Sequence, residues 1–192
     1  MDSKSTDSNT IAFLQGVSVP VIWNSTNSGP WVAPWVNVDV YNSMPDRFIL
    51  TDPDLQFNPH LPSDFIEQMC AIADRYRCSK LGFALDISDF KEMYQSIYCE
   101  GRTIYEQECQ FWKHRVTDDQ YEIYNAETDT TFALHDKNGD QSIRIRIAGR
   151  FTAKHIPWYV KNTIYSRDEL NTVYSNTSAI STTGRMIIRS DI

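Results

Sequence analysis

The segment at residues 141–156, "QSIRIRIAGRFTAKHI", constrains the fold of this chain more than any other stretch. Ile143, Ile145 and Ile147 alternate with charged residues, and this period of two places successive side chains on opposite faces of a β-strand. The apolar face of such a strand has to be covered by other elements of the protein. The segment therefore predicts one strand of a sheet with a buried face.

Two segments have helical patterns. Residues 63–77 begin with Ser63 as a candidate N-cap and carry apolar residues at helical spacing, which predicts an amphipathic helix. Its core side chains would be Phe65, Met69, Ile72 and Tyr76. A second helix is expected at residues 88–101, with Ser88 as its cap and Gly101 as its stop.

The remaining patterned segments read as strands. The alternation of Val36, Val38 and Val40 predicts a half-buried strand, and "KLGFALDI" at residues 80–87 predicts another. Further strands are expected at residues 102–116, 120–134 and 141–156. This order predicts an α+β fold, a single domain in which one or two helices pack on an antiparallel sheet.

The length of 192 residues suits one domain with a proper core. We expect a disordered tail at residues 1–10, an extended aromatic arm at 11–35, a globular domain at 36–167 and a polar, mobile tail at 168–192. No apolar run reaches the length of about 20 residues that a spanning helix needs, and no signal peptide fits. The four cysteines lack CxxC pairing. An intracellular, reducing setting is therefore expected.

The stretch "HDKNGDQSI" at residues 135–143 resembles the opening of an EF-hand calcium loop. Such a loop needs Gly at its sixth position and a bidentate Glu at its twelfth. Counted from Asp136, these positions hold Gln141 and Ile147. Asn138-Gly139 between two strand patterns is instead a strong signal for a tight hairpin. The sequence therefore predicts a β-hairpin and no calcium binding.

Four basic residues share one face of the predicted strand at residues 141–156. They are Arg144, Arg146, Arg150 and Lys154. One interpretation is a basic ribbon that contacts phosphates of an anionic membrane surface or a nucleoprotein. The other is a solvated face whose arginines pair with cross-strand acids such as Glu122, Glu127 or Asp129. Gly149 is expected to bulge the strand and to split the ribbon after Arg146.

No catalytic set emerges from the sequence. Cys109 and His114 lie five positions apart on one expected strand, so their side chains would point to opposite faces. Glu106 and Glu108 would share a strand face, at a spacing that glycosidase carboxylates can have. The four histidines show no metal-binding spacing, and no Gly-rich phosphate loop exists. We therefore expect a protein that is not an enzyme and has no cofactor or metal.

The tryptophans Trp23, Trp31 and Trp35 lie in a region rich in proline and glycine with few charges. They could fill the core, form a sugar platform, or dock the arm on another subunit. A proline-broken segment has little local structure in which to bury them. Trp31, Pro34 and Trp35 are therefore the candidate self-association residues of a homo-oligomer.

The order of elements from residue 36 to residue 151, together with Cys99-Glu100-Gly101-Arg102 at the start of an expected strand, resembles rhabdovirus matrix proteins. This resemblance implies a non-enzymatic viral shell protein that self-associates and contacts membrane and nucleocapsid. The chain departs from that family in its acidic N-terminus and in having no PPxY or PSAP motif.

The net charge of -7 opposes general nucleic-acid binding, so any contact with anions would need a local basic patch. We expect a self-associating structural protein of the matrix or shell type. The alternatives are a β-rich ligand-binding domain, for example for carbohydrate, and a hydrolase that uses Cys or Glu.

Overall fold

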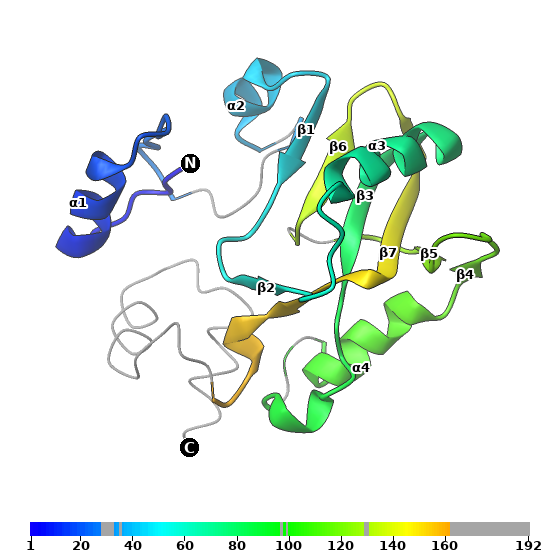
Figure 1. Cartoon of the computed structure of the whole chain (residues 1–192). Helices are drawn as coiled ribbons and strands as arrows, with labels where there is room; N and C mark the ends of the chain where they lie inside the picture. Colours follow the sequence, from blue (N-terminus) through cyan, green and yellow to red (C-terminus); the bar gives the residue numbers. More distant parts are fainter. Residues whose placement is uncertain (28–32, 35, 97, 99, 129–130, 162–192) are drawn as a thin grey trace. The chain divides into compact units, whose positions relative to one another are not determined.

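The computed structural model describes residues 1–27, 33–34, 36–96, 98, 100–128 and 131–161 (Figure 1). The chain divides into two compact units, Met1–Met44 and Pro45–Ile192. The larger unit thus begins at Pro45 and not at residue 36, where the sequence predicted the start of the globular domain. The expected C-terminal tail, residues 168–192, lies outside the described residues.

The first unit has local structure where a tail and an extended arm were predicted. Helix α1 (Ser8–Gly16) begins after Asp7, whose carboxylate accepts a hydrogen bond of 2.8 Å from the Thr10 amide. The first amides of a helix have no hydrogen-bond acceptor within the helix. Because an N-cap side chain supplies such an acceptor, it favours a helix at this position. Asp2 pairs with Trp23 in an isolated bridge. The chain is therefore helical at Ser8–Gly16, where a tail and then an extended arm were predicted.

The predicted strand around Val36, Val38 and Val40 is a helix. Helix α2 (Val38–Ser43) follows Asn37, which adopts the left-handed conformation with φ 51°. Asn is one of the few residues that tolerate this conformation, and it turns the chain into the helix. The alternation of valines indicated a strand, but a strand needs a partner, and Val36 pairs only with Ala33 in an isolated bridge within the described residues.

In its described part, the second unit is built on a mixed sheet of seven strands. Their order is β1-β6-β3-β7-β5-β4, and β2 pairs with β7 outside this path. The strands are β1 (Arg47–Leu50), β2 (Leu55–Phe57), β3 (Cys78–Leu85), β4 (Arg115–Val116), β5 (Ile123–Asn125), β6 (Ala133–Asp136) and β7 (Asp140–His155). All pairs are antiparallel except β3 with β7, which is parallel. The α+β class is confirmed.

The strand that the alternating isoleucines predicted is β7, and it is the longest of the sheet. It contacts β3 along most of its length, and the register shifts between Phe83 and Ala84. Gly149 lies at this shift with φ +64°, a conformation that glycine adopts without strain. The predicted bulge at Gly149 is therefore confirmed.

The predicted hairpin at Asn138-Gly139 is wrong. The loop joins β6 to β7, but β3 lies between these strands, so they do not pair with each other. Neither Asn138 nor Gly139 has the positive φ that a type I′ turn requires. Glycine is needed here because the loop passes close to the start of β3: a Cβ atom on Gly139 would lie 2.4 Å from the carbonyl oxygen of Cys78.

We expect the Gly139→Ala substitution to lower the free energy of unfolding by about 1–3 kcal/mol, since the added methyl group meets backbone that cannot rotate away. Gly16→Ala is the matched control, because outside its two chain neighbours and the backbone of its own helix no atom lies within 4 Å of the place that its added methyl group would take. Urea unfolding followed by circular dichroism measures both. Equal stability of the two variants would contradict the close approach of loop and strand.

Helix α3 (Phe65–Tyr76) covers one face of the sheet and lies within the predicted range 63–77. Met69 and Ile72 are completely buried, while Phe65 and Tyr76 are half-buried against the same core. The helix ends at Arg77, which adopts the left-handed conformation and donates its amide to the carbonyl oxygens of the last turn. The predicted helix and its apolar face are confirmed.

The segment at residues 102–116, predicted as a strand, is mostly helical. Helix α4 (Ile104–Cys109) is followed by a 3-10 helix (Gln110–Trp112). Thr103 and Glu106 form a capping box, in which each side chain bonds the backbone amide of the other residue. Among the described residues of 88–101, where a second helix was predicted, the structure has only a 3-10 helix (Phe90–Glu92). Another 3-10 helix (Ile156–Trp158) follows β7.

Candidate functional site

The four basic residues of β7 do not form a continuous exposed ribbon. Arg146 is buried and forms an ion pair of 2.7 Å with Glu108 of α4. Its guanidinium also donates to the Glu127 carbonyl oxygen at 2.6 Å and lies 3.9 Å from the ring centroid of Phe111. The prediction that Arg146 contacts an external anion is therefore wrong, because α4 and the chain after it cover this side of the strand.

Two of the other three residues also have carboxylate partners. Arg144 pairs with Glu127 at 3.0 Å, and Lys154 pairs with Asp89. The hydrogen bond to Asp89 raises the pKa of Lys154. Arg150 is exposed and has no ion pair with a described residue. The geometry favours the interpretation in which these residues pair within the protein.

The candidate self-association residues are only partly among the described residues. Trp31 and Trp35 lie outside them, and Pro34 lies in a turn between the bridged residues Ala33 and Val36. The described part of this segment exposes four large apolar side chains. Their exposed fractions are 70% for Phe13, 65% for Val19, 47% for Trp23 and 37% for Ile22. None of the residues of α1 is buried.

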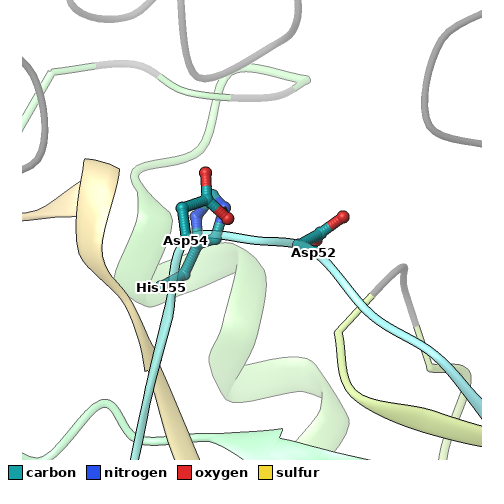
Figure 2. Close-up of side chains that lie close together, drawn as sticks. All are labelled: Asp52, Asp54 and His155. Atoms are coloured by element: carbon teal, nitrogen blue, oxygen red, sulfur yellow. The ribbon is translucent and has the colours of Figure 1, made fainter. Parts of the chain in front are cut away.

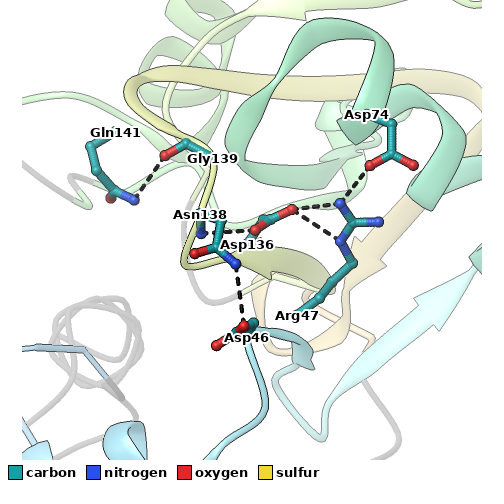
Figure 3. Close-up of polar contacts among 7 residues, drawn as sticks. All are labelled: Asp46, Arg47, Asp74, Asp136, Asn138, Gly139 and Gln141. Atoms are coloured by element: carbon teal, nitrogen blue, oxygen red, sulfur yellow. Dashed lines mark hydrogen bonds and ion pairs between the residues drawn. The ribbon is translucent and has the colours of Figure 1, made fainter.

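The loop that resembles a calcium site is held by contacts within the protein (Figure 3). Asp136 accepts hydrogen bonds from Arg47 at 2.5 Å and from the Asn138 amide at 2.9 Å. Burial alone would raise the pKa of Asp136, but the Arg47 side chain lowers it. Arg47 also pairs with Asp74 at 2.6 Å, and Asn138 donates to Asp46. Strands flank the loop, as predicted. The negative charge of its Asp136 carboxylate is already balanced by the Arg47 guanidinium.

Within the described ranges, the carboxylates and thiols considered for hydrolysis do not form a catalytic pair. Glu106 is in the capping box, and Glu108 is buried with Arg146. Burial raises the pKa of the Cys78 thiol to about 11, so it stays protonated at neutral pH. Burial, with Lys80 and Arg144 nearby, lowers the pKa of His135 to about 4. Cys99 lies outside the described residues.

A cavity of about 540 Å³ opens beside the end of β7. Its wall includes Asp89, Lys91, Lys154 and Tyr159, and therefore carries charges of both signs. Asp89 already accepts hydrogen bonds from Lys154 and Tyr159. Burial raises the pKa of Tyr159, and its hydrogen bond to Asp89 raises it further. Because the ring of Tyr159 is itself buried, it offers no exposed platform for a sugar.

One cluster of possible metal ligands was not predicted from the sequence. Asp52 and Asp54 lie on the loop between β1 and β2, and His155 ends β7 (Figure 2). One donor atom from each residue lies within 4.8 Å of the other two. The two aspartates flank Pro53, a local signal, but about a hundred residues separate them from His155. No sequence spacing could therefore join the three.

No family model, curated protein sequence or solved structure matches this chain. The resemblance to rhabdovirus matrix proteins therefore stays a prediction. Among the helices within the described ranges, none has both the length and the apolar character that crossing a bilayer requires.

Proposed function

We propose that this chain is a non-enzymatic structural protein that self-associates through residues 11–35, with a second copy of the chain as its partner. The observation that carries this proposal is the exposure of Phe13, Val19, Ile22 and Trp23 within one short segment. Exposed apolar side chains favour an interaction site, since their burial against a partner removes apolar surface from water and gains free energy.

The charge pattern favours another copy of the chain as the partner. From Ser8 to Val38 the sequence contains no charged residue, while the whole chain has a net charge of -7. Two copies repel each other through most of their surface, but an uncharged segment allows them to meet without like-charge contacts. An anionic membrane or a nucleic acid would be attracted by lysine and arginine, which this segment lacks.

The chemistry of the larger unit supports a scaffold and not an enzyme. Glu108 is buried against Arg146, and the thiol of Cys78 is held in its protonated form. A matrix or shell protein, as the sequence resemblance implies, would use such a unit as a rigid body and would assemble through an appended segment. Contact with membrane or nucleoprotein is not assigned to β7, because Arg144, Arg146 and Lys154 already have carboxylate partners.

The double variant Phe13→Ser/Trp23→Ser tests the segment. Burying one large apolar side chain contributes about 1.5–3 kcal/mol, so we expect the dissociation constant of self-association to rise at least about tenfold. Val160→Ser is the matched control, because Val160 is an apolar residue of the larger unit with 57% exposure. Sedimentation equilibrium gives the constants, and circular dichroism checks that each variant is folded.

If the double variant and the control associate as tightly as the unmodified chain, the contact lies elsewhere and the proposal fails. If the double variant is monomeric and the control is not, the segment is the contact. Added vesicles of neutral lipid provide a further check. Binding of the unmodified monomer to them in place of self-association would identify a membrane as the partner and would also overturn the proposal.

A further inference from the structure

We propose that Asp52, Asp54 and His155 bind a divalent transition-metal ion such as Zn²⁺ or Mn²⁺. The three side chains come from two segments that are joined by backbone hydrogen bonds. Leu55 pairs with His155 between β2 and β7, and the Ile156 amide donates to the Asp54 carbonyl oxygen at 3.0 Å. The loop and the end of β7 thus hold the donors together before any ion binds.

Two buried polar atoms in this cluster lack hydrogen-bond partners among the described residues. They are Asp54 Oδ1 and His155 Nδ1, each almost inaccessible to water. His155 Nε2 lies 3.4 Å from Asp54 Oδ1, but the two atoms lack hydrogen-bond geometry. Leaving a buried carboxylate oxygen and an imidazole nitrogen unsatisfied is costly, and a bound cation would satisfy the carboxylate directly.

The spacing of the donors suits a single ion. Metal–oxygen and metal–nitrogen distances of about 2.0–2.2 Å place the donors of one ion roughly 3.3 to 4.4 Å apart. The three donor atoms already lie within 4.8 Å of one another. Figure 2 shows Asp54 next to the ring of His155, while Asp52 extends from the same loop. All three side chains thus lie close enough to offer donors to one ion.

The donor types select the class of metal. Imidazole nitrogen suits zinc and other transition metals, whereas calcium and magnesium prefer ligand sets made of oxygen only. Two carboxylates and one imidazole would neutralise a divalent cation and would leave further positions for water. The ion would hold the β1–β2 loop against β7, and we assign it this structural role.

Thermal unfolding of the whole chain, first stripped with a chelator, tests the proposal. We expect Zn²⁺ or Mn²⁺ at saturating concentration to raise the melting temperature by about 5 °C or more, since an ion that binds only the folded state stabilises it. Calcium should have a much smaller effect. Asp54→Asn and His155→Ala should each abolish the shift, while the exposed residues changed in Asp119→Asn and His114→Ala should leave it intact.

Co²⁺ binding provides a readout that does not depend on stability. We expect its visible absorption spectrum to be that of nitrogen and oxygen ligands, and to disappear in His155→Ala. A thiolate charge-transfer band would instead place the ion at cysteine. That band, a metal-dependent shift that survives in Asp54→Asn and His155→Ala, or no shift in the unmodified chain would each overturn the proposal.

Discussion

Replacement of Arg146 by methionine is expected to lower the free energy of unfolding by about 3–5 kcal/mol, one of the two largest effects that the structure predicts. The guanidinium and the Glu108 carboxylate have exposed side-chain fractions of only 2% and 7%. Methionine retains much of the volume of arginine but leaves the Glu108 carboxylate buried without its cation. The expected loss of stability therefore comes from the unpaired charge of the buried Glu108 carboxylate, and not from a cavity.

The double variant Arg146→Met/Glu108→Met distinguishes these causes. Because both charges are gone, we expect it to recover most of the lost stability and to come within about 1 kcal/mol of the unmodified chain. Arg144→Met is the matched control, since its ion pair with Glu127 is solvent-exposed and is expected to contribute less than about 1 kcal/mol. Urea unfolding measures the free energy of unfolding of the unmodified chain, of the two single variants and of the double variant. Equal losses in Arg146→Met and Arg144→Met would contradict the buried pair.

Phe83→Ala is expected to cost a similar 3–5 kcal/mol, because a large ring is removed from a fully packed site. Four phenylalanine rings surround Phe83, with ring centroids 5.0 to 6.1 Å away. They are Phe57, Phe65, Phe132 and Phe151. Since these side chains come from β2, α3, β7 and the chain before β6, they cannot all collapse into the cavity.

Ile66→Ala is the control for this prediction, because Ile66 lies on α3 with 43% of its surface exposed and should change stability by about 0.5 kcal/mol. Thermal and urea unfolding of both variants measures the difference. A loss below about 1 kcal/mol for Phe83→Ala would show that the core is not centred on this ring.

The sequence predicted the elements whose burial follows one simple period. Met69 and Ile72 recur at helical spacing, and the isoleucines of β7 recur at every second position, so one face of each element was recognisable. The parallel pairing of β3 with β7 could not be predicted, because it depends on which strand enters between β6 and β7. Asn138-Gly139 indicated a tight hairpin turn. In the structure, glycine is needed at position 139 for another reason, because a Cβ atom there would collide with the backbone of Cys78.

The error with the widest consequence concerns residues 102–116. Their apolar residues were read as a strand, although the Thr103–Glu106 capping box is itself a sequence signal for a helix start. Reading Ile104 and Glu108 as one helical face would have placed a carboxylate on a buried side and suggested an arginine partner. The exposed ribbon on β7 depended on this mistake, since α4 is what covers Arg146.

The candidate metal ligands could not have been found from spacing, because Asp54 and His155 meet only after β2 pairs with β7. The segment proposed for self-association, residues 11–35, is the opposite case. Its composition alone separates it from the rest of the chain, and the exposure of Phe13 and Trp23 adds to that signal. The unit Pro45–Ile192 has a core of its own and would keep its fold without that segment.

Light scattering of the whole chain over a series of concentrations tests the central claim most directly. We expect the molar mass to rise to at least twice that of the 22.2 kDa chain, and the same measurement on residues 45–192 to give a monomer at every concentration. A whole chain that stays a 22.2 kDa monomer at the highest attainable concentration would contradict the account.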